Sequence, residues 1–225
     1  MTARLTPATR MGLSIAAAVG VYGVSFGALS TGSGLSVLQT CALSLLMFTG
    51  GSQFAFIGVI GGGGTGAAAW AAATLLGVRN GVYALSLKTL IEPPGRLVPL
   101  MAQLTIDEST ATATAQTERD ERVRGFWTAG IGIYILWNAS TLVGALAGDA
   151  IGDPRRWGLD GAAVAAFLGL LWPRLQGRDP VALAIVSALV TVMVLPMVPP
   201  GIPVLVAAGA TALWWAWQQR RAVRP

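Results

Sequence analysis

One long apolar stretch, Leu75-Leu76-Gly77-Val78-Arg79-Asn80-Gly81-Val82-Tyr83-Ala84-Leu85-Ser86-Leu87, carries a single guanidinium group in its middle. Toward the N-terminus from Arg79, no Asp, Glu, Lys or Arg occurs until Arg10. A charge inside so long an apolar tract normally faces a protein interior or a wet cavity, because lipid does not solvate it. On a helix, Arg79 and Tyr83 share one face and Asn80 lies beside them. The stretch therefore predicts either an anion or carboxylate site, or an arginine that only ties helices together.

The composition places the chain in a bilayer. Hydrophobic residues make up 54% of its 225 residues and charged residues 11%, whereas soluble domains carry about 25% charged residues. The net charge of +5 comes from short basic clusters between apolar segments, which are topology signals and do not indicate nucleic-acid binding. We therefore predict an all-α, polytopic integral membrane protein with about seven to eight membrane helices, some of them short or discontinuous.

The side chains that most enzymes need are scarce. The chain has no histidine and one cysteine, Cys41, so it lacks the residues for His-based zinc sites and for Ser–His or Cys–His pairs. No Gly-Lys-Ser or Gly-Lys-Thr sequence exists, which argues against a P-loop. We predict no metal, no cofactor and no enzymatic activity, and an intramembrane enzyme is the least favoured interpretation.

The apolar segments form a single predicted transmembrane domain that covers residues 1–225. Glycine and proline clusters separate them, and 97–116 is too polar to face lipid, so we expect it to be buried or re-entrant. Tryptophans lie mostly near predicted segment ends, as in an aromatic belt: Trp127, Trp137, Trp157, Trp172, Trp214, Trp215 and Trp217. The predicted segments are 11–29, 35–60, 66–90, 97–116, 126–147, 161–172, 181–194 and 202–217.

The arginines favour cytoplasmic termini. If 97–116 crosses the membrane, most basic clusters fall on one side, as the positive-inside rule requires. If it does not cross, the two halves of the chain place their clusters on opposite sides. We predict a multi-pass protein of the cytoplasmic membrane with both termini inside, and a hairpin remains the alternative for 97–116.

A second unusual stretch, Gly50-Gly51-Ser52-Gln53-Phe54, interrupts segment 35–60. Paired glycines before two hydrogen-bonding side chains weaken a helix, and the freed backbone groups could hold a substrate. Transporters use such discontinuous helices near mid-membrane, with helix N-termini facing substrate carboxylates. The alternative is a small-residue crossing point for another helix.

Two adjacent carboxylates, Asp107 and Glu108, follow an apolar run. They could couple transport to protons, since ionisable groups inside a membrane commonly form proton relays. They could also cap the next helical stretch. Successive helical residues point about 100° apart, so at most one is expected to face a given cavity.

Taken in order, these motifs resemble the AzlC family, the large subunits of branched-chain amino acid exporters. The resemblance rests mainly on the first half of the chain. The matching stretches are Gly23-Val24-Ser25-Phe26-Gly27, Gly34-Leu35-Ser36, Gly50-Gly51-Ser52-Gln53-Phe54, Val78-Arg79-Asn80-Gly81-Val82-Tyr83-Ala84-Leu85-Ser86-Leu87, and the stretch from Leu104 to Ala111.

The resemblance implies export of branched-chain amino acids, with methionine as a further candidate, driven by the proton gradient. It also implies a small AzlD-type membrane subunit as partner. The alternatives are a non-transporting assembly subunit that leaves the transport site to its partner, and an exporter of another small amino-acid-like solute. The predicted substrate-binding residues are Arg79, Asn80, Tyr83, Gly50, Gly51, Ser52, Gln53, Phe26 and Phe54, and the predicted proton-coupling residues are Asp107 and Glu108.

Overall fold

The computed structural model is all-helical over the residues that it describes, which are 5–151, 156, 161, 164, 165, 168, 169 and 171–222. The all-α class is confirmed for these residues, whereas the predicted segment 161–172 lies partly outside them. The α-helices are α1 (Pro7–Gly20), α2 (Tyr22–Gly32), α3 (Val37–Leu46), α4 (Gly51–Gly61), α5 (Gly66–Ile91), α6 (Val98–Leu104), α7 (Asp107–Thr114), α8 (Arg119–Ile151), α10 (Arg178–Val194) and α11 (Ile202–Ala222), with short 3₁₀ turns η1 (Gly95–Leu97) and η3 (Trp172–Arg174).

Local sequence explains where several helices begin and end. A capping box starts α3, in which the Gln39 backbone N–H donates to Ser36 Oγ at 3.2 Å and the Ser36 N–H donates to Gln39 Oε1 at 2.8 Å. Thr65 caps α5 by accepting the Ala68 N–H at 3.2 Å. That helix ends at Glu92, whose φ of 50° is left-handed, and two prolines follow.

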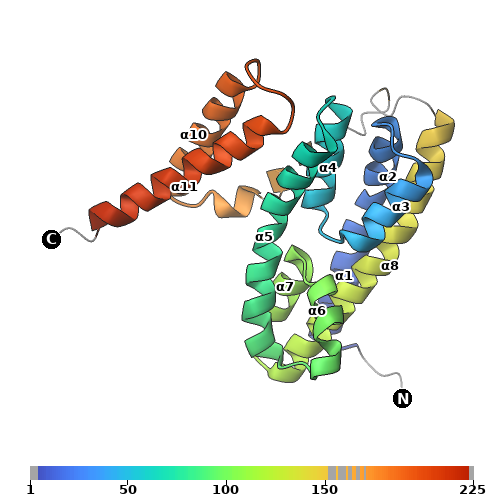
Figure 1. The fold of residues 1–225 in the computed structure, drawn as a ribbon. Coiled ribbons are helices and arrows are strands. Elements are labelled where there is room, and N and C mark those ends of the chain that lie inside the picture. The colour runs from blue at the N-terminus through green and yellow to red at the C-terminus, as the bar shows by residue number, and fades with distance from the viewer. Residues whose placement is uncertain are drawn as a thin grey trace.

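Glycines allow α2 to lie directly against α8. Gly23 and Gly27 of α2 press on α8, and Gly144 and Gly148 of α8 press on α2 (Figure 1). A Cβ added at Gly27 would lie 2.6 Å from the backbone nitrogen of Ala145, so no larger residue fits without moving backbone. Each pair is spaced four residues apart, which is the small-residue spacing that lets membrane helices approach closely. The assembly of α1, α2 and α8 therefore forms one side of the bundle.

Besides segment 11–29, in which α1 and α2 meet at Val21, two further predicted segments are each built from two short helices. Segment 35–60 contains α3 and α4, separated by non-helical residues 47–50, and segment 97–116 contains α6 and α7, separated by Thr105 and Ile106. By contrast, α5 is one unbroken helix, although Gly77 and Gly81 flank Arg79. In Figure 1, α4 and α7 lie one above the other between α5 and α8.

Only some helices meet the length and hydropathy needed to cross a membrane. Among the described residues these are the stretches Pro7–Gly32 and Arg119–Gly148. The apolar helices Val37–Leu46, Gly51–Gly61 and Ile202–Trp217 are shorter. The count of seven to eight membrane helices therefore stays a prediction.

The C-terminal helices stand apart from the bundle. Figure 1 shows α10 and α11 as a pair beside α5. The hydroxyl groups of Ser187 and Thr211 join the two helices at 2.9 Å. The main core lies instead among α1, α2 and α4 to α8, where Phe26 and Phe126 are fully buried.

Candidate functional site

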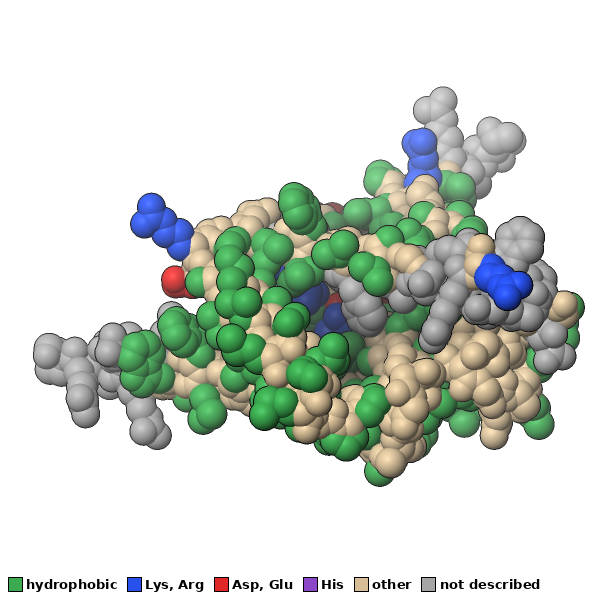
Figure 2. Space-filling view, turned by 90° about the horizontal axis from the view of Figure 1, so that it is seen from above, with side chains coloured by type: hydrophobic (Ala, Val, Ile, Leu, Met, Phe, Trp, Pro, Cys, Tyr) green, Lys and Arg blue, Asp and Glu red, His purple; other side chains and the backbone are tan. Residues whose placement is uncertain are grey.

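A cavity of about 230 Å³ lies where α4, α5, α7 and α8 meet. Both interrupted segments contribute to it, because Gly50 and Gly51 line it from one break and Asp107 and Glu108 from the other. Seen from above, the molecule is hollowed, with basic and acidic side chains deep inside and a mostly apolar rim (Figure 2). The apolar walls of the cavity include Tyr22, Phe48, Phe54, Ile106, Ile133 and Trp137.

Side chains from α4, α6 and α8 stabilise the break between α3 and α4. Helix α3 leaves its last carbonyl groups without intrahelical partners. Gln53 Nε2 donates to the carbonyl of Ser44 at 3.3 Å, and that of Leu45 accepts from Gln103 Nε2 at 2.9 Å and from Tyr134 Oη at 3.3 Å. In membrane proteins, non-helical backbone within the bilayer is tolerated where it is buried in protein or lines a water-filled cavity.

Helix α4 begins beside the cavity at Gly50, whose φ of 52° a larger side chain would adopt only with strain. The first backbone N–H groups of a helix have no intrahelical acceptor. Gly50 and Gly51 both line the cavity, so this helix start presents hydrogen-bond donors there. The predicted interruption thus places donors next to the site.

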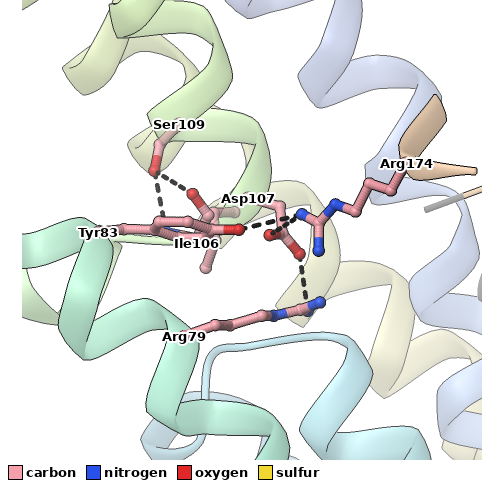
Figure 3. A network of polar contacts seen from close by, with 6 residues as sticks. All are labelled: Arg79, Tyr83, Ile106, Asp107, Ser109 and Arg174. Carbon is pink, nitrogen blue, oxygen red and sulfur yellow. Dashed lines mark hydrogen bonds and ion pairs between the residues drawn. The ribbon is translucent and has the colours of Figure 1, made fainter. Parts of the chain in front are cut away.

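Ser109 organises the second break. Its hydroxyl group donates to the carbonyl of Leu104 at 2.7 Å. It also accepts the backbone N–H of Ile106 at 3.0 Å (Figure 3). Ser109 is fully buried. It therefore satisfies backbone groups on both sides of the turn that carries Asp107.

Replacing Ser109 with alanine is expected to lower the free energy of unfolding by about 1–3 kcal/mol, because a buried N–H and a buried carbonyl lose their partner. Thermal unfolding of the purified protein in detergent would measure this change. Ser86→Ala is the matched control, since the Ser86 hydroxyl donates to Val82 on the exposed side of α5. Equal stability of the two variants would contradict the role given to Ser109.

Asp107 lies between two arginines. Its Oδ2 is 2.6 Å from Arg79 Nη2 on α5, and its Oδ1 is 3.4 Å from Arg174 Nη2 on η3 (Figure 3). The same Nη2 of Arg174 donates to Tyr83 Oη at 3.0 Å. Tyr83 thus joins the site through Arg174, one turn along α5 from Arg79. Glu108 also lines the cavity, and it makes no ion pair with any described residue.

Several polar groups of the cavity residues are buried without a partner. These are Thr49 Oγ1, Arg79 Nε and Trp137 Nε1. Buried polar groups in folded proteins are nearly all hydrogen-bonded. Three such groups lie around one cavity, where a polar ligand or a water molecule would find hydrogen-bond partners.

The predicted site residues separate into groups. Arg79, Gly50, Gly51, Phe54, Asp107 and Glu108 line the same cavity. Phe26 lies behind its wall, with its ring centroid 5.7 Å from that of Phe54 and 6.2 Å from that of Trp137. Gln53 is fully buried and bonds the α3 carbonyl instead of lining the cavity.

Two predicted residues belong to other hollows. Asn80 lines a second cavity, of about 740 Å³, whose wall includes Phe48 and Thr49 from the first. Ser52 lines a third, of about 320 Å³, beside Gly77. Adjacent helical residues point about 100° apart, which turns each of them away from the neighbour that faces the site.

Sequence reasoning missed Trp137 and Arg174. Trp137 was assigned to the aromatic belt, but it is 4% exposed and packs against Phe26 and Phe54, so that assignment is wrong. Trp137 lies in the middle of segment 126–147, whereas aromatic-belt residues lie near segment ends, so its position in the sequence already argues against the belt. Arg174 is one of the basic residues between apolar segments, and nothing in the sequence links it to Asp107, 67 residues earlier.

Comparison with known proteins agrees with the earlier resemblance. No curated protein and no solved structure matches the chain. The family described as AzlC protein matches residues 14–151, which is more than half of the chain. The matched range contains every residue that lines the first cavity except Ala165 and Gly169. That family indicates a transport-related role in a membrane. The chain therefore belongs to the AzlC family.

Proposed function

We propose that this chain exports branched-chain amino acids, with methionine as a further substrate, as the large subunit of a two-component exporter. The observation that carries the proposal is the cavity at the two helix breaks, which joins charged groups of both signs to apolar walls. An amino-acid zwitterion needs this combination. At about 230 Å³, the cavity is also smaller than the sites that hold drug-sized ligands.

The substrate would bind with its polar end toward the breaks. Arg79 and the N–H groups at the start of α4 would face its carboxylate, as half-helix N-termini do in other transporters. Glu108 would face its ammonium group. The aliphatic side chain would contact the apolar walls, and Tyr83, Asn80, Ser52, Gln53 and Phe26 would support this arrangement from behind or beside it.

Apolar outer faces support a multi-pass arrangement in the cytoplasmic membrane. On α5, Val78, Val82 and Leu85 are 60%, 57% and 71% exposed and lie along one side of the helix. On α8, Ile135 and Val143 are similarly exposed. Contiguous exposed apolar surface of this extent is rare on soluble monomers. We propose seven to eight membrane segments, some discontinuous, with both termini in the cytoplasm.

The proposed energy source is the proton gradient, with Asp107 or Glu108 as the coupling group. Both carboxylates line the cavity, so a proton and a substrate would meet there. The proposed partner is a small hydrophobic membrane subunit of the AzlD type.

Efflux of preloaded labelled amino acids tests the proposal. Cells lacking other exporters would carry this chain with and without the small subunit. We expect leucine, valine and methionine to leave faster only when both proteins are present, and a protonophore to abolish the difference. Absence of efflux for all three amino acids, with both proteins inserted in the membrane, would contradict the proposal.

The second candidate is an assembly subunit whose partner carries the transport site. It is favoured by one observation, the 2.6 Å contact that already pairs Arg79 with Asp107. Under this alternative, replacing the cavity-wall residue Phe54 with alanine would leave efflux by the pair unchanged. Under the proposed function, the same change is expected to weaken leucine transport more than that of a smaller amino acid such as valine.

A further inference from the structure

The two oxygens of the Asp107 carboxylate bind different cations. Oδ2 contacts Arg79 from α5 at 2.6 Å, and Oδ1 contacts Arg174 from η3 at 3.4 Å (Figure 3). The Arg79 side chain is 25% exposed and that of Asp107 12%, whereas that of Arg174 is 53% exposed. The closer and more buried partner is thus the arginine that lines the cavity.

This pairing leaves little room for a second anion on Arg79. A ligand carboxylate that enters the cavity meets a guanidinium group already bound to a carboxylate of the protein. The Arg79 Nε is buried without a partner, so the guanidinium group still has donor capacity. A ligand carboxylate that binds both Nε and Nη2 nevertheless competes with Asp107 for Nη2 and for the single positive charge of Arg79.

Arg174 lies close enough to Asp107 to remain its ion-pair partner after Asp107 has lost its contact with Arg79. It is held in position by Tyr83, whose hydroxyl group accepts from the same Nη2 at 3.0 Å. A buried carboxylate without any cation is strongly disfavoured. A second guanidinium group within 3.4 Å removes most of that penalty, because Asp107 would keep one partner throughout.

We propose that the substrate carboxylate displaces Asp107 from Arg79, and that Arg174 is a positioning residue that retains the displaced Asp107. The inference rests on the proposed function, because it names how the same cavity selects a carboxylate. No covalent bond changes in this exchange. Arg174 acts on the ligand only through Asp107, and this gives the proposal a sharp test.

The test is a double-mutant cycle on leucine binding. The full chain in lipid nanodiscs, with its small partner subunit, would carry Asp107→Asn, Arg174→Gln or both. We expect Asp107→Asn to tighten leucine binding roughly tenfold or more, because the competing charge is gone. Arg174→Gln is expected to weaken it by up to about fivefold, as for a half-exposed ion pair. The double variant should match Asp107→Asn, because without the Asp107 charge Arg174 has nothing to retain.

Leucinol, which lacks only the carboxylate, provides the matched ligand. Its binding is expected to change little in all three variants. Glu92→Gln is the control variant, because it removes a carboxylate from the exposed pair with Arg119, 3.5 Å apart, away from the cavity. Leucine binding to this control should equal that of the unmodified chain.

Different failures have different meanings. If the unmodified protein binds none of leucine, valine and methionine, the proposed function fails and this inference fails with it. If it binds leucine but Asp107→Asn weakens binding, the proposed displacement of Asp107 is wrong, whereas the proposed function is not contradicted. If Arg174→Gln still weakens binding in the Asp107→Asn background, Arg174 does not act through Asp107.

Discussion

Arg79→Ala is expected to reduce amino-acid efflux by about a hundredfold while the protein still inserts in the membrane. The change removes the cation proposed to face the substrate carboxylate and also leaves Asp107 with only the more distant Arg174. Truncating one partner of a buried, hydrogen-bonded charge pair costs about 2–5 kcal/mol. Efflux of labelled leucine, normalised to the amount of inserted protein, would measure the loss.

Two further variants separate binding from structure at this position. The Arg79→Ala/Asp107→Ala double variant removes both charges of the pair, so it is expected to restore stability without restoring transport. Arg119→Ala is the matched arginine control, since Arg119 pairs with Glu92 on the exposed surface. Recovery of transport in the double variant would show that Arg79 only neutralises Asp107.

Gly144→Val is expected to cause the largest loss of stability in the chain, more than about 3 kcal/mol. A Cβ at this position would overlap the backbone of Val24 on α2. Backbone inside a helix yields much less readily than the end of a flexible side chain. The contact between α2 and α8 would therefore have to open along its length, and the folded fraction after solubilisation would fall.

The control for this prediction is Gly209→Val on α11, where an added Cβ meets no atom within 4 Å. It makes the same change in helix propensity without the overlap. Thermal unfolding and the yield of monodisperse protein would be compared for the two variants. Equal behaviour would mean that the close approach of α2 and α8 does not hold the bundle together.

The sequence indicated the parts of this site that depend on local rules. An arginine in an apolar tract and a glycine pair inside an apolar segment each break an expectation for membrane helices, and the cavity lies between them. The two carboxylates inside segment 97–116 likewise lie at a helix start, as the capping interpretation expects. These features could be predicted because each one is recognised from a short run of neighbouring residues and needs no knowledge of contacts between distant parts of the chain.

The remaining features depend on contacts between distant parts of the chain. The hairpin alternative for 97–116 does not locate the break at Thr105 and Ile106, because an isoleucine does not signal a turn, and it is Ser109 that satisfies the backbone there. The pairing of Arg174 with Asp107 depends on where η3 lies after folding. Asn80 was placed in the site by its neighbour Arg79, yet a single helical step turns it toward another cavity.

The short helices α4 and α7, which both start at the cavity, affect how readily protons could leak across the membrane. Both α4 and α7 begin at the cavity, and each helix start carries roughly half a positive charge from its aligned peptide dipoles. With Arg79 and Arg174 added, positive charge at the helix breaks outweighs the two carboxylates. Such positive ends oppose the free passage of protons and other cations through a pore, although a proton can still reach the carboxylates. Vesicles that contain the chain should therefore hold a proton gradient as long as empty vesicles do, until an amino acid is supplied.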